Sequence, residues 1–203
     1  MSPAKDRTVR PETNLRVGAL RISPNYTSVD WQALVCEDPT DWAQAADVVR
    51  DRLEGRFLRF ATDCLKHKDS GFVVLSIDCL LAETIQQFRE GLIDSKNQSA
   101  AVVMRFLEGP RFREDFPDEA VRRAFYGDIR CGLLHQAEAR SLWVIRRKRR
   151  SMLQQTQTQN GTAYVVGPAK LKSAMVRATM RTLALGLRRD LIEVDEICRS
   201  RRS

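Results

Sequence analysis

Two side chains with complementary chemistry stand five residues apart in the segment GDIRCGLLHQ, residues 127–136. Arg130 is permanently charged and offers a forked set of donors that matches phosphate oxygens. His135 is one of only two histidines in the chain, and histidine titrates near neutral pH. Together they could cleave RNA through attack by its own 2′-hydroxyl, with the imidazole moving protons and the guanidinium stabilising charge on phosphorus. This chemistry needs no metal ion and no organic cofactor, so we expect neither.

The spacing of the pair sets a geometric condition. Five residues rotate a regular α-helix by about 140°, so Arg130 and His135 do not share a face of one continuous α-helix. They can converge if the helix is distorted near Gly132, or if one of them comes from a second chain. Gly127 and Gly132 also allow another backbone to approach this helix closely. Because the chain contains 27 arginines, such a spacing also arises by chance, and its surroundings have to support it.

Three acidic residues are candidates to support the pair: Glu83, Asp128 and Glu138. Glu138 could orient the imidazole from three residues further on, although an exposed surface position is the plainer interpretation. Glu83 lies in an apolar segment, where a carboxylate without a partner is costly, so we expect it to face outward or to meet an arginine. His135 could instead only bond the last carbonyls of its helix. Arg130 could be only the partner of a carboxylate.

Apolar residues at steps of three and four predict the helices that position these side chains. The predicted helices cover residues 38–68, 69–94, 99–109, 116–140 and 168–198. Thr40 or Asp41 is the expected N-cap of the first helix, and Gly55 is a weak point inside it. The second helix is apolar nearly all round in its first half, so we expect it at the centre of a bundle. Asp78 in that helix is likewise expected to face outward or to meet an arginine.

The pattern changes after the fourth predicted helix. Short β-prone runs near residues 142–146 and 162–166 predict two or three short antiparallel strands. Asn160-Gly161 is a typical hairpin turn signal between them. We therefore expect a β-hairpin insertion over residues 141–167.

These elements define a fold class and a domain organisation. The predicted fold is mainly all-α, a helical bundle of four to five helices with a small antiparallel β-hairpin insertion. Residues 1–13 are polar and contain two prolines, so we expect them to be disordered. Residues 14–203 are expected to form a single domain that ends with the helix over residues 168–198.

Positive charge is concentrated in the last third of the chain. Residues 140–203 contain 15 Lys and Arg against 4 Asp and Glu, whereas residues 1–139 contain 19 against 22. This asymmetry indicates a polyanionic partner, most often nucleic acid, although a solvated basic surface is the plainer alternative. The candidates for binding the RNA backbone are Arg146, Arg147, Lys148, Arg149 and Arg150. This basic segment could also dock a protein partner, and no base-reading motif accompanies it.

The sequence contains no feature of a secreted or membrane protein. Its longest apolar run, residues 71–82, is shorter than a membrane span and is interrupted by Ser76 and Asp78. The N-terminal residues have no apolar core that would make a secretory signal. Five cysteines occur without a zinc-type spacing, so we expect reduced thiols, no metal site and a cytoplasmic location.

The segment FYGDIRCGLLHQAEA, residues 125–139, resembles the HEPN superfamily of helical-bundle proteins. The signature of that family is an arginine, four to six residues and a histidine near the end of a bundle helix, which Arg130 and His135 match. The resemblance covers about residues 40–140. It implies a metal-independent endoribonuclease that dimerises with two motifs facing one cleft, in which Arg130 contacts phosphate and His135 moves protons. It also implies a role in toxin–antitoxin or phage-defence systems, with an antitoxin or another protein as a further partner.

One position departs from this family and keeps two other interpretations open. The family often has Asn, Asp or His directly after the arginine, and this chain has Cys131. A first alternative is therefore a catalytically inactive HEPN-like module that binds RNA or protein. A second is a structural or interaction protein whose arginines never meet nucleic acid. RNA cleavage in EDTA, and the dependence of RNA binding on salt, separate the three.

Overall fold

The computed structural model of the chain describes residues 20–35, 38–147 and 149–186. In chain order its α-helices are α1 (Ser28–Gln32), α2 (Pro39–Leu53), α3 (Arg59–Cys64), α4 (Gly71–Glu90), α5 (Ser99–Leu107), α6 (Glu119–Ala124), α7 (Gly132–Gln136) and α8 (Pro168–Gly186). Two π-helical segments, η2 (Glu54–Leu58) and η3 (Phe125–Cys131), join α2 to α3 and α6 to α7 without a break. The prediction of a mainly helical fold with a small sheet is confirmed. The predictions for residues 1–13 and 187–198 lie outside the described residues.

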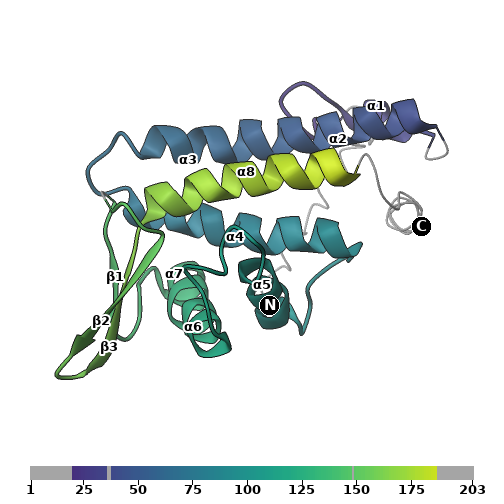
Figure 1. The fold of residues 1–203 in the computed structure, drawn as a ribbon. Helices are drawn as coiled ribbons and strands as arrows, with labels where there is room; N and C mark the ends of the chain where they lie inside the picture. The colour runs from purple at the N-terminus through teal and green to yellow at the C-terminus, as the bar shows by residue number, and fades with distance from the viewer. Residues whose placement is uncertain (1–19, 36–37, 148, 187–203) are drawn as a thin grey trace, which may run out of the picture.

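The helices form layers around α4 (Figure 1). The α2–α3 rod and α8 lie alongside each other on one side of α4, and α5 and the α6–α7 rod lie on the other side. Leu75, Leu81 and Ile85 of α4 are almost fully buried. The central position expected from the apolar first half of this helix is therefore confirmed.

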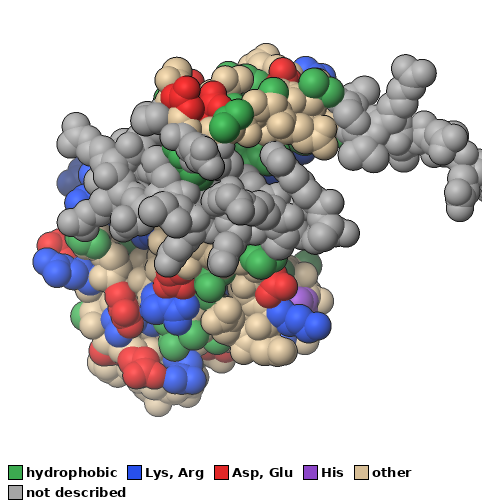
Figure 2. Space-filling model, turned by 90° about the vertical axis from the view of Figure 1, so that its right-hand side faces the viewer, with side chains coloured by type: hydrophobic (Ala, Val, Ile, Leu, Met, Phe, Trp, Pro, Cys, Tyr) green, Lys and Arg blue, Asp and Glu red, His purple; other side chains and the backbone are tan. Residues whose placement is uncertain are grey.

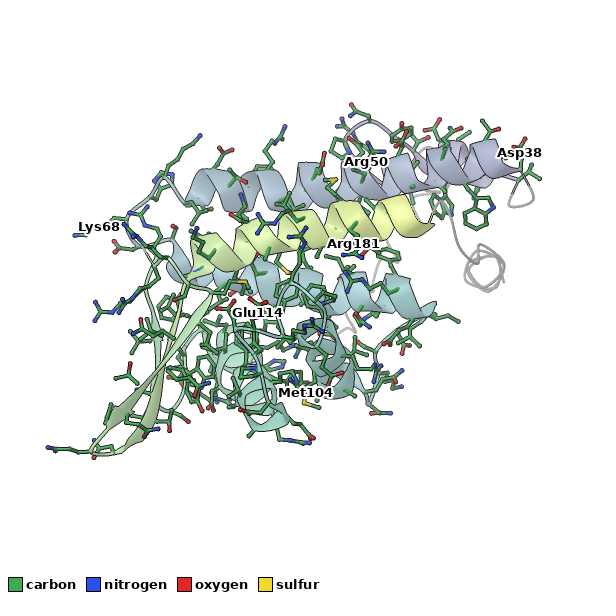
Figure 3. The ribbon with its side chains drawn as sticks, in the orientation of Figure 1. Asp38, Arg50, Lys68, Met104, Glu114 and Arg181 are labelled. Carbon is green, nitrogen blue, oxygen red and sulfur yellow. The ribbon has the colours of Figure 1, made fainter. Side chains whose placement is uncertain are left out.

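The start and the middle of the first long rod differ from a simple α-helix. The carboxylate of Asp38, labelled in Figure 3, accepts a hydrogen bond of 2.7 Å from the backbone N–H of Thr40, and proline follows Asp38 at the first helical position. The prediction of Thr40 or Asp41 as N-cap is therefore wrong. Gly55 lies in η2, where a Cβ atom would collide with the ring of Pro24. The expected weak point is thus the place where the preceding loop packs on the rod.

The sheet has the strand order β1–β3–β2, in which β1 is Trp143–Ile145, β2 is Leu153–Thr158 and β3 is Gly161–Val166. β2 and β3 form the predicted antiparallel hairpin, and Gly161 has a φ of 114° beside the turn at residues 159–160. β1 pairs with β3 in parallel, so the prediction of only antiparallel strands is wrong. The reason is the chain path, because residues 146–152 carry the chain to the far edge of β3 before the hairpin begins.

Aromatic packing joins this sheet to the rod that contains η3. The ring of Trp143 stacks on that of Tyr164, with centroids 4.5 Å apart and planes 17° apart. Trp143 also meets the edge of Phe125 at 5.8 Å, and Phe125 in turn contacts Phe116 at 5.1 Å. Such offset and edge contacts add to the burial of apolar area. The base of the hairpin is therefore fixed to the helix that bears Arg130.

The central helix is also the most apolar segment. By length and composition α4 is able to cross a membrane, and no other helix among the described residues is. Half of its apolar window is buried inside the protein, as in the core helix of a folded bundle. The helix continues to Glu90, eight residues beyond the apolar run at residues 71–82.

Candidate active site

Arg130 and His135 lie together on one rod. The Nη1 atom of Arg130 is 3.4 Å from the Nε2 atom of His135. Arg130 belongs to the π-helical segment η3, in which backbone hydrogen bonds close five residues back rather than four. This segment ends at Cys131, and His135 lies in the α-helix α7, so the two side chains converge across the junction of the two segments next to Gly132. Of the two arrangements considered for the pair, the structure contains the approach within one chain.

Gly132 and the turn after α7 place His135 at an exposed helix end. A Cβ atom on Gly132 would lie 2.5 Å from the backbone oxygen of Glu138, so the expected close approach of another backbone occurs here. Nothing lies within 4 Å of a Cβ atom on Gly127, so that expectation is wrong for Gly127. The carbonyls of Gly132 and Leu133 accept hydrogen bonds from the backbone of residues 138 and 137. The imidazole is therefore not needed to cap these carbonyls.

Glu83 on α4 binds the guanidinium of Arg130. Its Oε2 atom is 2.7 Å from Nη2 of Arg130, and the two side chains are only 10% and 16% exposed. The other carboxylate oxygen accepts a hydrogen bond from the hydroxyl of Ser95, and the hydroxyl of Ser99 lies 3.3 Å from that of Ser95. Of the two expectations for Glu83, facing outward or meeting an arginine, the second is confirmed.

The charges of this pair are set by its surroundings. Burial works against ionisation of Glu83, but hydrogen bonds from Ser95, Ser99 and Arg130 outweigh it and lower the pKa of Glu83 below its ordinary value. Burial likewise disfavours charge on Arg130, but its bond to Glu83 raises the pKa of Arg130 above the ordinary value. Both groups are therefore charged throughout the neutral range.

An aromatic ring completes the setting of the guanidinium. The Arg130 side chain lies over the ring of Tyr126, 5.5 Å from its centroid. Burial raises the pKa of Tyr126, and its hydrogen bond to the Cys131 thiol raises it further. The Nε atom of Arg130 is buried and has no hydrogen-bond partner among the described residues. The guanidinium is thus held on Glu83 and Tyr126, with Nη1 next to His135.

The arrangement suits a proton transfer beside a fixed positive charge. A hydrogen bond from Nη1 of Arg130 to Nε2 of His135 requires the imidazole tautomer that carries its proton on Nδ1. A neutral imidazole is the form that a general base requires. A phosphate oxygen placed against Nη1 would receive a charge-assisted hydrogen bond from Arg130.

The other predicted site residues are not brought to the pair. The Asp128 and Glu138 side chains make no hydrogen bond or ion pair among the described residues, and Glu138 is exposed. Arg147 donates hydrogen bonds to the carbonyls of residues 65 and 67 at the end of α3. Arg146, Arg149 and Arg150 are exposed, and Lys148 lies outside the described residues.

Ion pairing divides the described chain into two parts. Each ion pair among the described residues uses a cation at or before Arg130: Arg50–Asp47, Lys66–Asp63, Arg105–Glu90, Arg122–Glu108, Arg123–Glu119 and Arg130–Glu83. Figure 2 shows a face on which acidic and basic side chains lie next to one another in this way. Within the described ranges, the cations from Arg140 onward make no ion pair.

Some residues of the site could not be found from sequence. Ser95 and Ser99 meet Glu83 across the turn between α4 and α5, and nothing in their local pattern indicates this contact.

The described residues were compared with the requirements of a metal site, and the chain with known proteins. Within the described residues, no three His, Cys, Asp or Glu side chains are grouped so that they could hold a metal ion. The described cysteines, Cys64, Cys79 and Cys131, are free thiols. No protein-family model, no curated protein and no solved structure matches the chain.

Proposed function

We propose that this protein is a HEPN-like, metal-independent endoribonuclease that uses Arg130 and His135. The observation that carries the proposal is the 3.4 Å approach of these two side chains, with Arg130 held by Glu83 at 2.7 Å. A fixed guanidinium beside an exposed imidazole is the pair that cleavage by an RNA 2′-hydroxyl requires. The spacing of the pair matches the family signature from which the proposal takes its name.

In the proposed reaction His135 takes the proton of the 2′-hydroxyl through Nε2. The 2′-oxygen attacks the adjacent phosphorus, the bond from phosphorus to the 5′-oxygen breaks, and a second acid protonates that leaving oxygen. The products are a 2′,3′-cyclic phosphate and a 5′-hydroxyl. Arg130 stabilises the negative charge that develops on the phosphoryl oxygens. Glu83 and Tyr126 act as positioning residues, because they orient the guanidinium.

The second acid is proposed to come from a second copy of the chain. The exposed face of α4 carries a stripe formed by Val73, Leu80 and Phe88, which are 39–51% exposed. The hydroxyls of Ser76 and Thr84 on this face bond carbonyls one turn earlier in the same helix, which leaves the stripe apolar. Exposed apolar side chains that lie together on one helix face are typical of an interface. Pairing of two α4 stripes would give an isologous dimer with two copies of His135.

The basic composition of the last third supports RNA as the substrate. The chain has no Asp or Glu from residue 139 to residue 189, and this stretch contains twelve Lys and Arg. A surface of this charge attracts a phosphate backbone and binds it in a salt-dependent way. A cytoplasmic role in toxin–antitoxin or phage-defence systems, with an antitoxin as partner, remains part of the proposal and depends on the family resemblance alone.

A catalytically inactive RNA- or protein-binding module is the second candidate. The observation that favours it is Cys131, whose thiol makes a hydrogen bond with Tyr126. At this position the family often has the amide, carboxylate or imidazole of Asn, Asp or His. Incubation of the protein with RNA in EDTA distinguishes the two. Cyclic phosphate ends support the nuclease, whereas binding that weakens with salt but never cleaves supports the module. Absence of any salt-dependent RNA binding contradicts the nuclease and the RNA-binding module.

A further inference from the structure

The β2–β3 hairpin is an uncharged arm attached to a basic protein. From Leu153 to Val166 it contains no Asp, Glu, Lys or Arg, and its polar side chains are amides and hydroxyls. All residues of β2 after Leu153 are exposed. The hairpin extends beyond the helices at one end of the molecule (Figure 1). Its outer part therefore contributes nothing to the described core, although its sequence is well suited to hydrogen bonding.

The base of the arm is rigid while its outer part is free. Leu153 and Val166 are paired in the register and buried, and Tyr164 stacks on Trp143. Beyond them the strands are held by their backbone ladder and by a side-chain bond of 3.1 Å from Gln157 to Thr162. A rigid base reduces the entropy that a flexible loop would lose on binding a ligand.

The charges beside the arm indicate the kind of ligand. Arg146, Arg149 and Arg150 are exposed before β2, and none of them forms an ion pair with another residue that the structure describes. Cations at the base could contact phosphates while the neutral outer part reaches between them. An acidic peptide would match the cations, but it would not account for the glutamine amides of the hairpin.

The geometry points to the hairpin as a groove-contacting arm for base-paired RNA, an inference that rests on the proposed function for the choice of RNA. A-form RNA has a wide, shallow minor groove that displays 2′-hydroxyls and base edges. Amides and hydroxyls donate and accept hydrogen bonds to such groups, whereas charged side chains would favour the phosphates. Because alternate residues of a strand share a face, Gln155 and Gln157 point to the same side, next to the loop residue Gln159.

Binding to a duplex RNA of 18 base pairs, compared with a DNA duplex of the same sequence, tests this inference. The wild-type protein is expected to prefer the RNA duplex, because DNA lacks the 2′-hydroxyls and the A-form groove. The variant Gln155→Ala/Gln157→Ala/Gln159→Ala is expected to lose about tenfold in RNA affinity and most of that preference. The variant Gln155→Glu/Gln157→Glu keeps the side-chain shape but adds two negative charges. Its affinity for the RNA duplex is expected to be no higher than that of the triple alanine variant.

A matched control makes the same charge change elsewhere. Gln32 and Gln44 are exposed on α1 and α2, which lie at the opposite end of the molecule from the hairpin (Figure 1). The variant Gln32→Glu/Gln44→Glu is expected to bind the RNA duplex as the wild type does. Circular dichroism and light scattering of each variant report its fold and its oligomeric state.

The outcomes separate this inference from the proposed function. Hairpin variants that bind the RNA duplex like wild type, or a wild type that binds RNA and DNA equally, would overturn the groove-contacting arm. A change of oligomeric state as the main effect would also overturn it, because the exposed edge of β2 would then be pairing with a protein strand. Hairpin-dependent RNA binding without any cleavage in EDTA would support the arm and contradict the nuclease.

Discussion

Glu83 on α4 and Arg130 on η3 form an ion pair of 2.7 Å that connects the centre of the bundle to the candidate site. The two residues are 47 positions apart in sequence, and both side chains are largely buried. Because the pair fixes one edge of the guanidinium, the other edge is directed at His135. The position of the arginine therefore depends on the packing of α4 against the rod that carries η3 and α7.

Replacement of Glu83 by glutamine tests this dependence. Glu83→Gln keeps the shape but leaves Arg130 as a largely buried cation without a counter-ion, so we expect the free energy of unfolding to fall by about 2–4 kcal/mol. RNA cleavage should fall at least tenfold, because the guanidinium loses its orientation. Glu90→Gln on the same helix is the control, since Glu90 pairs with the half-exposed Arg105 at 2.6 Å. Equal losses of cleavage in both variants would contradict the positioning role of Glu83.

Replacement of the two glycines of the site rod by alanine should have opposite effects. Gly132→Ala places a methyl group 2.5 Å from the backbone oxygen of Glu138, so the turn after His135 has to move. We expect a loss of about 1–3 kcal/mol in the free energy of unfolding, together with lower cleavage. Gly127→Ala meets open space and should stabilise the helix by up to about 1 kcal/mol. Chemical denaturation measures both, and a destabilised Gly127→Ala with an unaffected Gly132→Ala would contradict the described turn.

Asp78 makes stability depend on pH. Both of its carboxyl oxygens are buried and have no hydrogen-bond partner in the described part of the chain, and burial raises the pKa of Asp78 well above its usual range despite the nearby Lys172. In the unfolded chain the group ionises near pH 4, whereas the folded protein retains the proton. The free energy of unfolding attributable to Asp78 should therefore fall as pH rises, by about 1.4 kcal/mol per unit, until the folded carboxyl also ionises.

Comparison with an uncharged variant isolates this effect. The difference in unfolding free energy between Asp78→Asn and wild type should grow in favour of the variant from pH 4 upward. Urea denaturation at several pH values measures it. A difference that stays constant over this range would mean that Asp78 does not retain its proton in the folded protein. Of the two expectations for this residue, facing outward or meeting an arginine, the described residues fulfil neither.

The proposed dimer can be tested on the stripe of α4. Leu80→Arg places a charge in the middle of the apolar stripe, and we expect a dimer to become a monomer in light scattering. Cleavage should fall with it, because the second copy of His135 is lost. Phe60→Arg is the control, since Phe60 on α3 is 50% exposed but lies outside the stripe. A wild type that is a monomer at micromolar concentration would contradict the dimer.

The sequence predicts the long helices well, because apolar spacing of three and four residues records which face is buried. The central place of α4 and the hairpin follow from such local signals. The spacing does not reveal η3, since the same apolar pattern is compatible with hydrogen bonds to the fourth or the fifth residue back. The approach of the Arg130 and His135 side chains across the junction of η3 and α7 is therefore not visible in the sequence pattern.

The contacts that complete the site depend on tertiary structure. Glu83 could be expected to need an arginine, but which arginine is decided by the packing of α4 on the α6–α7 rod. The link to Ser95 depends on the turn that leads into α5. The parallel pairing of β1 with β3 is likewise decided by the path of the intervening chain, on which strand propensity has no bearing.

The role of the Arg130–His135 pair is tested most directly by the cleavage of RNA in EDTA by two variants, each of which lacks one histidine. His135→Ala should reduce the rate at least a hundredfold while circular dichroism shows a folded protein, because the proposed general base is lost. His67→Ala removes the other histidine, whose exposed side chain lies between α3 and α4, and should cleave like wild type. Cyclic phosphate ends that form as fast with His135→Ala as with His67→Ala would contradict the proposed role of the Arg130–His135 pair.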